Sequence, residues 1–583
     1  MSHPGAEHAL RGAMAEFARG NLAESRRLCR AALELQPRDA RVFHLSAAIA
    51  LREGRREEAE RDLRKSVELD PALPDAQASL GAVLLNRHAI AEARPHLERA
   101  VALRPAEPMW RYNLALCDVE DGRFDEAAAG LEAALRSRPE WPEALNTLGS
   151  IHVSRGDAAA GRALIDSALR LSPSMASAWN NLGVADAALG NLPAAREAFQ
   201  RCISLAPRDP TGWIQLGNVE RAQGHRDAAE RAYRQATSIA PEHAGAWQNL
   251  GNLLREAGQL DEAVASLEHA VQRNGGAPAH MGLAVALLAS GKLQRAWKEY
   301  AWRSGVPPRA VEEILAQSRQ APSVLAIESE QGLGDSLFFL RWAGLPEWRA
   351  GLDLRWEGDP RLDPLLEGTG LSLDRRGGSS ARVRVAAGEL PRLAGSSTVA
   401  HPAPLALALT QALRDDALKA LEAAGPGPYL AVAWRAGSPP RPGEEVLTKR
   451  VPLGLFARAL ASWRGTLVSV QRHPEAGEID ELRRESGRPV LDAAAFNEDL
   501  PRMAGLLSAV DLYAGVSSTN VHIAAGVGGA ARILVPYPPD WRYAGKDATT
   551  PWFPGYALHR QDPEGGWERS LGELSAALAA RAP

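Results

Sequence analysis

Residues 173–206 read PSMASAWNNLGVADAALGNLPAAREAFQRCISLA, and the plan of this stretch recurs along the first half of the chain. Its leading proline belongs to a series with a constant spacing of 34 residues. The series comprises Pro37, Pro71, Pro105, Pro139, Pro173, Pro207 and Pro241. A fixed period of this length indicates one supersecondary unit that is stacked on copies of itself. The series stops near residue 275.

Each copy carries small residues at fixed places. A leucine and a glycine follow the proline by nine and ten positions, as in Leu182 and Gly183, and a second glycine follows it by seventeen, as in Gly190. Because glycine lacks bulk, two helices can approach closely at the first glycine, and the second suits a left-handed helix C-cap. The proline cannot continue the second helix. The pattern therefore predicts one pair of packed helices per copy.

This pattern resembles the tetratricopeptide repeat family over roughly residues 6–277, in eight copies. The resemblance implies an α superhelix over residues 1–277, in which the first helices of the pairs line a concave groove. The residue just before the leucine of the repeat is polar in these copies, and these residues are Ser79, Asn113, Thr147, Asn181, Gln215 and Asn249.

The polar column resembles the asparagine ladder of O-GlcNAc transferase, in which side-chain amides hold a substrate polypeptide. An amide can pair with the N–H and C=O groups of a peptide backbone whatever its sequence. We therefore expect a peptide groove, with a polypeptide acceptor or a partner protein as its occupant, at Asn113, Asn181, Gln215 and Asn249. The alternative is that these side chains bridge neighbouring helices.

Bulk composition excludes some partners. The chain has 583 residues and a formal net charge of −4, which gives no reason to expect a nucleic acid or an anionic membrane surface. Neither a secretory signal nor an apolar stretch of about 18 residues is apparent, so we expect no membrane span. The three cysteines, Cys29, Cys117 and Cys202, all lie in the repeats, which fits a reducing compartment. We expect a cytoplasmic protein.

The repeat pattern degenerates after Gly276. Residues 278–320 are predicted to form a degenerate ninth repeat, a cap and a linker, because terminal repeats are usually atypical. We expect Trp297, Tyr300 and Trp302 to pack this cap against the next domain.

From about Pro322 the sequence alternates between short apolar runs and helical patterns. Val324–Ile327 suits a buried parallel strand, and Gln331–Ser336 supplies a glycine-rich loop before a helix. Backbone N–H groups at such a turn favour anions. The dinucleotide-binding fingerprint would place a third glycine where Leu337 stands, so a nicotinamide enzyme is disfavoured.

A second alternating series begins at the strand Tyr429–Trp434, and Ile533–Pro536 is interpreted as its last strand. Two such series predict an α/β region with two Rossmann-like halves, at residues 321–427 and 428–583, the second with a C-terminal helix. Ligands of such folds bind at the carboxyl ends of the strands.

This region resembles the GT-B glycosyltransferases, and among them the bacterial repeat-fused group related to heptosyltransferases. The resemblance is carried by Gln331–Asp335, Val470–Gln471, Ser517–His522 and the tail from Pro538 to Pro554. It implies transfer of a sugar, with inversion, from a nucleotide diphosphate donor and without a further cofactor. No Asp-x-Asp cluster stands where a metal would be expected, so we predict that the reaction needs no metal.

Departure of a nucleoside diphosphate needs positive charge or N–H dipoles at the leaving phosphates. Helix-start residues supply the dipoles and basic residues the charge, although Lys449 could equally belong to a solvated loop pair. The predicted nucleotide-sugar site comprises Gly332, Gly334, Arg435, Lys449, Gln471, Ser518, Thr519 and Asn520.

Two residues are predicted to be catalytic. Asp335 matches the carboxylate that deprotonates the acceptor in heptosyltransferases, and its alternative role is a helix N-cap. His522 would reach donor oxygens, and its alternative role is a structural hydrogen-bond donor.

One position departs from the resemblance. Many relatives carry aspartate where Ser517 stands, and its loss removes an acceptor for sugar hydroxyls. The leading hypothesis is a glycosyltransferase that modifies Ser/Thr hydroxyls of a polypeptide, or another extended acceptor, held by the repeats. The competing hypothesis is a repeat scaffold with a degenerate transferase domain, and a third is an adaptor that binds no nucleotide.

Overall fold

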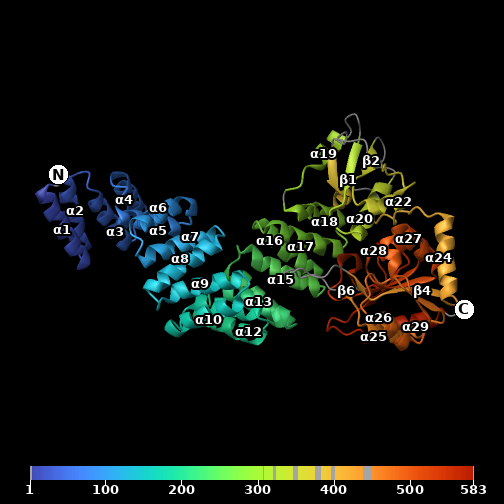
Figure 1. Ribbon diagram of the computed structural model, residues 1–583. Coiled ribbons are helices and arrows are strands. Elements are labelled where there is room, and N and C mark those ends of the chain that lie inside the picture. Colours follow the sequence, from blue (N-terminus) through green and yellow to red (C-terminus); the bar gives the residue numbers. More distant parts are fainter. Residues whose placement is uncertain are drawn as a thin grey trace. The chain divides into compact units, whose positions relative to one another are not determined.

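The computed structural model describes residues 3–305, 307–318, 324–345, 352–373, 383–395, 401–436, 449–545 and 547–581 (Figure 1). Contacts divide the chain into two compact units, Met1–Pro241 and Glu242–Pro583, which we call unit 1 and unit 2. Each unit is described by itself.

Unit 1 consists of helices that pack in consecutive pairs, so the predicted helical repeats are present. Its helices are α1 (Pro4–Ala18), α2 (Leu22–Leu35), α3 (Ala40–Arg52), α4 (Arg56–Leu69), α5 (Pro74–Asn86), α6 (Ile90–Leu103), α7 (Pro108–Glu120), α8 (Phe124–Ser137), α9 (Pro142–Ser154), α10 (Ala158–Leu171), α11 (Ala176–Ala188), α12 (Leu192–Leu205), α13 (Pro210–Ala222) and α14 (Arg226–Ile239).

The glycines of the repeat have the two roles that the sequence indicates. A Cβ atom on Gly183 would lie 2.6 Å from the Phe199 ring, so the bare backbone is what lets α11 and α12 meet. The second glycine of each copy has a positive φ, for example 77° at Gly190. In one copy His88 stands at this place and adopts a φ of 57°. That residue carries backbone strain that glycine avoids.

A side chain six positions after the repeat proline donates to the carbonyl oxygen of that proline. The donor differs between copies, but the bond recurs with lengths between 2.8 and 3.3 Å. It therefore ties the first helix of a copy to the turn that precedes it. The donors are Gln77, Arg111, Trp179 and Trp213.

Buried ion pairs join neighbouring copies of unit 1. Each joins an arginine of a second helix to an acid of the next first helix, 24 positions later: Arg94 with Asp118 (2.6 Å), Arg162 with Asp186 (2.8 Å) and Arg196 with Glu220 (2.8 Å). The acids are buried. Where alanine replaces the arginine, at Ala128, the acid is also replaced, by His152. Because an unpaired buried acid is costly, both partners change together.

The first part of unit 2 continues the helical pairs and ends in a short connection. Its elements are α15 (Ala244–Glu256), α16 (Leu260–Gln272), α17 (Gly276–Ala289), α18 (Leu293–Tyr300), η1 (Ala301–Ser304) and α19 (Val311–Ser318). None of the helices in the described ranges has the length and apolar character to cross a bilayer.

The larger sheet of unit 2 has six parallel strands in the order β11-β10-β9-β4-β7-β8. This is the common doubly wound order 3-2-1-4-5-6, in which β4 is the first strand and the order reverses between β4 and β9. The strands are β4 (Tyr429–Ala433), β7 (Thr466–Ser469), β8 (Val490–Asp492), β9 (Leu512–Val516), β10 (Ala531–Val535) and β11 (Ala557–Arg560).

Helices accompany this sheet, and several bury large side chains against it. Phe456, Trp463 and Trp567 share a core with Val432 and Trp434, and β4 is buried from Leu430 to Ala433. The helices are α24 (Gln411–Ala424), α25 (Leu453–Leu460), α26 (Glu478–Ser486), α27 (Leu500–Ala509), α28 (Thr519–Gly526) and α29 (Glu568–Ala579).

The first α/β half has a smaller parallel sheet in the order β2-β1-β3 among its described residues. Its elements are β1 (Val324–Glu328), α20 (Leu333–Leu340), η2 (Arg341–Gly344), β2 (Asp353–Trp356), η3 (Pro360–Leu362), α22 (Asp363–Leu366), β3 (Val383–Ala386), η4 (Ala387–Glu389) and α23 (Leu390–Leu393). The predicted strand–loop–helix at Val324–Leu340 is therefore present.

One sequence-based interpretation is wrong. Ile533–Pro536 is not the last strand, because β11 follows it and pairs with it in parallel. The short run Ala557–Arg560 contains a histidine and an arginine, and its strand character depends on the neighbouring β10 rather than on its own pattern.

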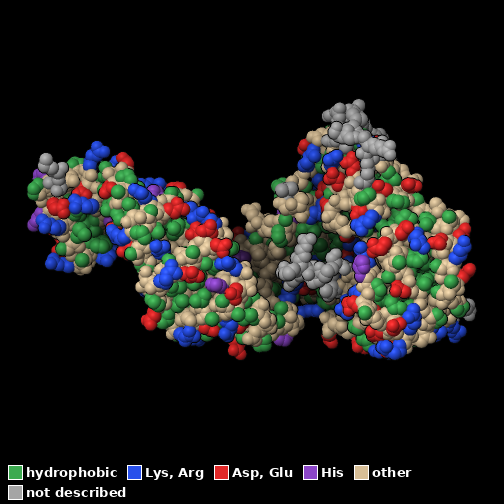
Figure 2. All heavy atoms as spheres, in the orientation of Figure 1, with side chains coloured by type: hydrophobic (Ala, Val, Ile, Leu, Met, Phe, Trp, Pro, Cys, Tyr) green, Lys and Arg blue, Asp and Glu red, His purple; other side chains and the backbone are tan. Residues whose placement is uncertain are grey.

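Charge is evenly distributed over the described residues on the face shown in Figure 2. Lys and Arg side chains alternate there with Asp and Glu side chains. This distribution agrees with the small formal net charge of −4.

Candidate functional site

The site lies where the two α/β halves of unit 2 meet, at the N-termini of α20 and α28; we call this region the junction. Gly332 is the N-cap of α20 and Ser518 is the N-cap of α28. A Cβ atom on Gly334 would lie 3.0 Å from Cδ2 of His522 and 3.3 Å from Cα of Thr519. The glycine loop therefore allows the two helix starts to come together. Unpaired N–H groups at both starts favour an anion between them.

An ion-pair network centred on the buried Arg542 crosses the junction. Nη2 of Arg542 lies 2.6 Å from Oδ1 of Asp335, and its Nη1 lies 3.1 Å from Oδ2 of Asp540. Nζ of Lys449 lies 3.6 Å from Oδ2 of Asp540. Burial alone would lower the pKa of Arg542, but the carboxylates of Asp540 and Asp335 raise it. Burial would raise the pKa of Asp540, but Arg542 and Lys449 lower it.

His522 is buried in the same cluster and is 8% exposed. Among the described residues its Nδ1 atom has no hydrogen-bond partner. Burial lowers its pKa well below 6.5, and the positive charges of Arg542, Arg341 and Lys449 lower it further. The imidazole is therefore neutral at pH 7 and holds one unsatisfied polar atom.

Arg341 adds a further buried cation. Its Nη1 donates to the carbonyl oxygen of Trp552 at 2.7 Å, and the guanidinium lies over the rings of Phe338 and Phe553. Within the described ranges it forms no ion pair with a carboxylate, and burial, followed by the charge of Arg542, lowers its pKa to about 9. Among the described residues, three cations thus stand near two carboxylates in this region, which leaves an excess of positive charge in a largely buried place.

The N-cap role considered for Asp335 is wrong. Gly332 occupies the cap position, and Asp335 is the third residue of the helix, where its carboxylate binds Arg542. Gly334, Thr519 and His522 lie together with Asp335 at the junction, as expected for parts of one site.

Three residues predicted to bind the nucleotide sugar use their polar atoms within the protein. The guanidinium of Arg435 binds the Glu478 carboxylate and donates to the His473 carbonyl at 2.7 Å. Gln471 is 3% exposed and accepts from two backbone N–H groups at the end of β4. The amide of Asn520 donates to the Val470 carbonyl and to Asn497, both at 3.2 Å.

These bonds hold loop ends in place, so this conformation does not present the three side chains to a ligand. The basic residues that do gather at the junction are Lys449, Arg542 and Arg341. Sequence reasoning selected Lys449 and missed the other two: Arg341 stands at an ordinary helix-like position, and Arg542 lies in the Pro538–Pro554 tail without having been singled out.

The side chains of Ser517 and Ser518 differ in their hydrogen bonds. The Ser517 hydroxyl is buried and lies 2.9 Å from the Tyr543 hydroxyl, so this side chain has a partner inside the protein. The Ser518 side chain makes no capping bond to its helix. The first N–H groups of α28 are therefore not covered by that side chain.

The last repeat helix touches both halves at the junction. Trp297 of α18 packs edge-on against Trp342 of the first half and against Trp541 of the second, with ring centroids 5.5 and 5.7 Å apart. Tyr300 accepts a hydrogen bond from Gln331 in the glycine loop at 3.0 Å. The cap thus packs against the α/β region through Trp297 and Tyr300, as predicted, whereas the ring of Trp302, which was predicted to do the same, stacks on His280 of α17.

The polar column of the repeats makes several bonds between helices. Ser79 lies 3.1 Å from His44, and Asn181 donates to Asn146 at 3.0 Å, in each case in the preceding repeat. Gln215 accepts from Asn218 within one helix at 3.1 Å. Asn113 is half-buried in unit 1, and Asn249, in unit 2, also has interaction partners. The bonds of Ser79 and Asn181 agree with the alternative in which the column bridges helices.

Comparison with known proteins supports the repeats. Models described as tetratricopeptide repeat match residues 40–73, 84–151, 146–210, 214–278 and 249–303. Protein FlbA of Caulobacter vibrioides is 26% identical over 354 residues, which cover 54% of this chain and 58% of FlbA. The chain therefore matches somewhat more than half the length of that curated relative.

Solved structures also match parts of the chain. The Cut9–Hcn1 hetero-tetramer of the APC/C is 20% identical with a TM-score of 0.38, over 48% of this chain and 55% of that one. TTC0263, a thermophilic TPR protein of Thermus thermophilus, is 25% identical with a TM-score of 0.29, over 31% of this chain and 99% of that one. The repeat pattern, the helix pairs and the family matches agree, and the matched segments of residues 40–303 are tetratricopeptide repeats.

Proposed function

We propose that unit 2 is a glycosyltransferase that binds a nucleoside diphosphate sugar at the junction and transfers the sugar with inversion to a hydroxyl group of an extended acceptor. The observation that carries this proposal is the pair of cations Arg542 and Lys449 beside the N-termini of α20 and α28, with Arg341 as a further buried cation near His522. A pyrophosphate supplies the negative charge that this arrangement lacks.

The topology of the larger sheet also supports a ligand site at the junction. The strand order reverses between β4 and β9, and α28 follows directly after β9. In doubly wound sheets, ligands bind outside the carboxyl ends of the strands at this reversal. The first half brings Gly334 and Asp335 to the same point, in keeping with a GT-B arrangement in which two such halves share one ligand.

In the proposed reaction the Asp335 carboxylate accepts the proton of the acceptor hydroxyl. The hydroxyl oxygen then bonds to the anomeric carbon on the face opposite the leaving group. The bond from the anomeric carbon to the diphosphate oxygen breaks, and both electrons remain on that oxygen. The helix N–H groups and the cations of the junction stabilise this charge, so we expect the reaction to need no metal.

The tetratricopeptide repeats would hold the acceptor polypeptide. Extended helical repeats offer a long surface for such a partner. The amide oxygens and N–H groups of Asn181 and Gln215 are only partly used by their bonds to neighbouring side chains. Rearrangement of these bonds would release groups for a peptide backbone.

Incubation of the full-length protein with UDP-, GDP-, ADP- and dTDP-sugars tests the activity. We expect release of one nucleoside diphosphate, unchanged by EDTA and lost in Asp335→Asn, but kept in Glu367→Gln, which alters an exposed acid of the same half. Absence of both binding and release for every donor would overturn the proposal and favour a scaffold with a degenerate transferase domain.

A further inference from the structure

A separate cavity of unit 2 lies between the last repeat helices and the first α/β half. It has a volume of about 550 Å³, within the usual range for small-molecule sites. Its walls come from α17, α18, η1, the connection at residues 307–312 and α23. Trp297 belongs both to its lining and to the aromatic packing of the junction, so the two sites share one wall.

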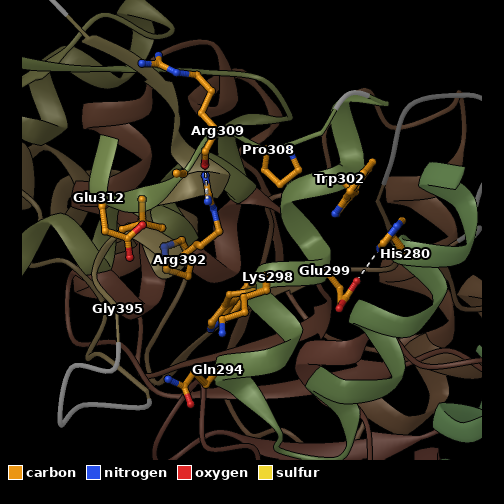
Figure 3. Close-up of a pocket in the computed structure, with 14 residues that line it drawn as sticks. His280, Gln294, Lys298, Glu299, Trp302, Pro308, Arg309, Glu312, Arg392 and Gly395 are labelled. Carbon is orange, nitrogen blue, oxygen red and sulfur yellow. Dashed lines mark hydrogen bonds and ion pairs between the residues drawn. The ribbon is translucent and has the colours of Figure 1, made fainter. Parts of the chain in front are cut away.

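An aromatic surface is held rigidly in this cavity. The His280 ring stacks on the Trp302 indole with a centroid distance of 4.2 Å and an interplanar angle of 2°. Nδ1 of His280 lies 2.6 Å from the Glu299 carboxylate, which fixes the imidazole (Figure 3). Because His280 covers one face of the indole, the opposite face and the ring edge of Trp302 are what remain to line the cavity.

The arginines of this cavity are already neutralised. Arg392 lies 2.6 Å from Glu389 and donates to the Arg309 carbonyl at 2.8 Å. Arg309 itself pairs with Glu313 at 3.4 Å. Neither guanidinium is therefore free to hold a phosphate.

The remaining polar groups offer both donors and acceptors. Lys298, Gln294 and Glu312 are exposed lining residues, and within the described ranges their side chains have no bonded partner. Within this set, the positive charge of Lys298 and the negative charge of Glu312 cancel. A strongly charged anion is thus disfavoured, and so is an apolar peptide, whose burial would leave these polar groups unsatisfied.

We propose that this cavity binds a neutral saccharide. The C–H face of a pyranose ring would lie on the Trp302 indole, because such C–H groups carry a partial positive charge and the face of an aromatic ring is negative. Hydroxyl groups, which both donate and accept, would pair with Lys298, Gln294 and Glu312. The saccharide site is distinct from the proposed diphosphate site, and its occupancy does not require transfer activity.

The test is saturation-transfer NMR of the full-length protein with glucose, N-acetylglucosamine, cellobiose, maltotriose and N,N′-diacetylchitobiose. We expect at least one saccharide to bind, and we expect Trp302→Ala to weaken it by about tenfold or more. Gln294→Ala, which changes an exposed side chain and so spares the fold, should weaken it about threefold. Gln272→Ala, also an exposed helical glutamine, should leave the affinity unchanged.

Three results would overturn the proposal. One is that none of the saccharides binds at concentrations up to about 10 mM, where even weak sites fill. Another is a saccharide signal that persists equally in Trp302→Ala and Gln294→Ala. The third is displacement of the saccharide from the wild-type cavity by a nucleoside diphosphate, which would place the saccharide at the junction instead.

Discussion

Arg542 donates to the carboxylate of Asp335 over 2.6 Å, although 207 positions separate the two residues. The bond joins the tail of the second α/β half to the first turn of α20 in the first. Arg542 also binds Asp540 and lies over the rings of Phe338 and Trp541. The position of the proposed base therefore depends on both halves being correctly packed.

Replacement of Arg542 by lysine should destabilise unit 2. Lysine has no planar fork, so it cannot serve Asp335 and Asp540 together, and we expect a loss of about 2–4 kcal/mol in the free energy of unfolding. Denaturant unfolding followed by tryptophan fluorescence measures the change. Arg569→Lys, at an exposed pair with Asp562, should leave the stability nearly unchanged. Equal effects at both positions would contradict the role given to the network.

Asp335→Asn should abolish transfer without unfolding the protein. Asparagine keeps the size of the side chain but accepts no proton, and removal of a general base typically costs about 10²- to 10⁴-fold in rate. The measurement is nucleoside diphosphate release from whichever nucleotide sugar the wild-type protein cleaves. Glu367→Gln is the matched control. Turnover within a factor of about two of wild type in Asp335→Asn would remove this residue from the chemistry.

His522 should make the stability of unit 2 sensitive to acid. Its pKa in the folded protein lies well below 6.5, so between the two values the unfolded chain binds more protons than the folded one. Stability should therefore fall as the pH is lowered below about 6.5, at up to about 1.4 kcal/mol per pH unit. Above this window the contribution is fully present.

The titration can be followed directly by NMR of ring-labelled histidine, with His522→Gln to assign the signal. We expect no inflection of the His522 shifts near pH 6.5. His559, whose pKa burial and then Arg532 lower to about 4, provides a second buried histidine for comparison. An ordinary titration of His522 near 6.5 would show that the imidazole is solvated.

His88→Gly should stabilise unit 1. His88 adopts a φ of 57° at a place where the other copies have glycine. Relief of the left-handed strain should raise stability by about 1 kcal/mol, less the entropy that glycine adds to the unfolded chain. Denaturant midpoints measure the gain. Gly122→Ala, at the equivalent place, should lower stability by a similar amount, and a loss in His88→Gly would contradict the argument.

The ion pair of Arg162 and Asp186 should be replaceable only as a pair. Arg162→Val leaves Asp186, which is 2% exposed, without its partner and should cost about 1–3 kcal/mol. Arg162→Val with Asp186→Leu should recover most of this loss. Arg136→Val, which removes an exposed arginine of α8, serves as the control. A double variant as unstable as the single one would contradict the argument that the unpaired Asp186 carboxylate causes the loss.

Much of the candidate site was predictable from local patterns. The glycine loop at Gly332 and Gly334, and the helix start at Ser518, follow from strand–loop–helix signals within a few residues. His522 and Asp335 were selected by resemblance, and the structure brings both to the junction. Arg435, Gln471 and Asn520 were also selected, Arg435 and Asn520 from the chemistry of the leaving diphosphate, but the polar atoms of all three are bonded within the protein.

Pattern alone could not distinguish these two groups. A basic or amide side chain at a strand end looks the same whether it faces a ligand or closes a loop. The difference lies in which distant partner reaches it: Glu478 reaches Arg435, whereas Asp335 and Asp540 reach Arg542. Arg341 gave no signal, because its burial results from packing against the tail around Trp552.

The repeats were determined by the sequence itself. Their contacts join residues within about one period, so the local sequence of each copy determines its helix pair. Even the pair of Arg94 and Asp118, which joins two copies, spans only 24 positions. The junction was decided by tertiary structure. Its charges come from segments more than 200 positions apart, and only the packing of two separately folded sheets gives them a common place and a low-dielectric environment.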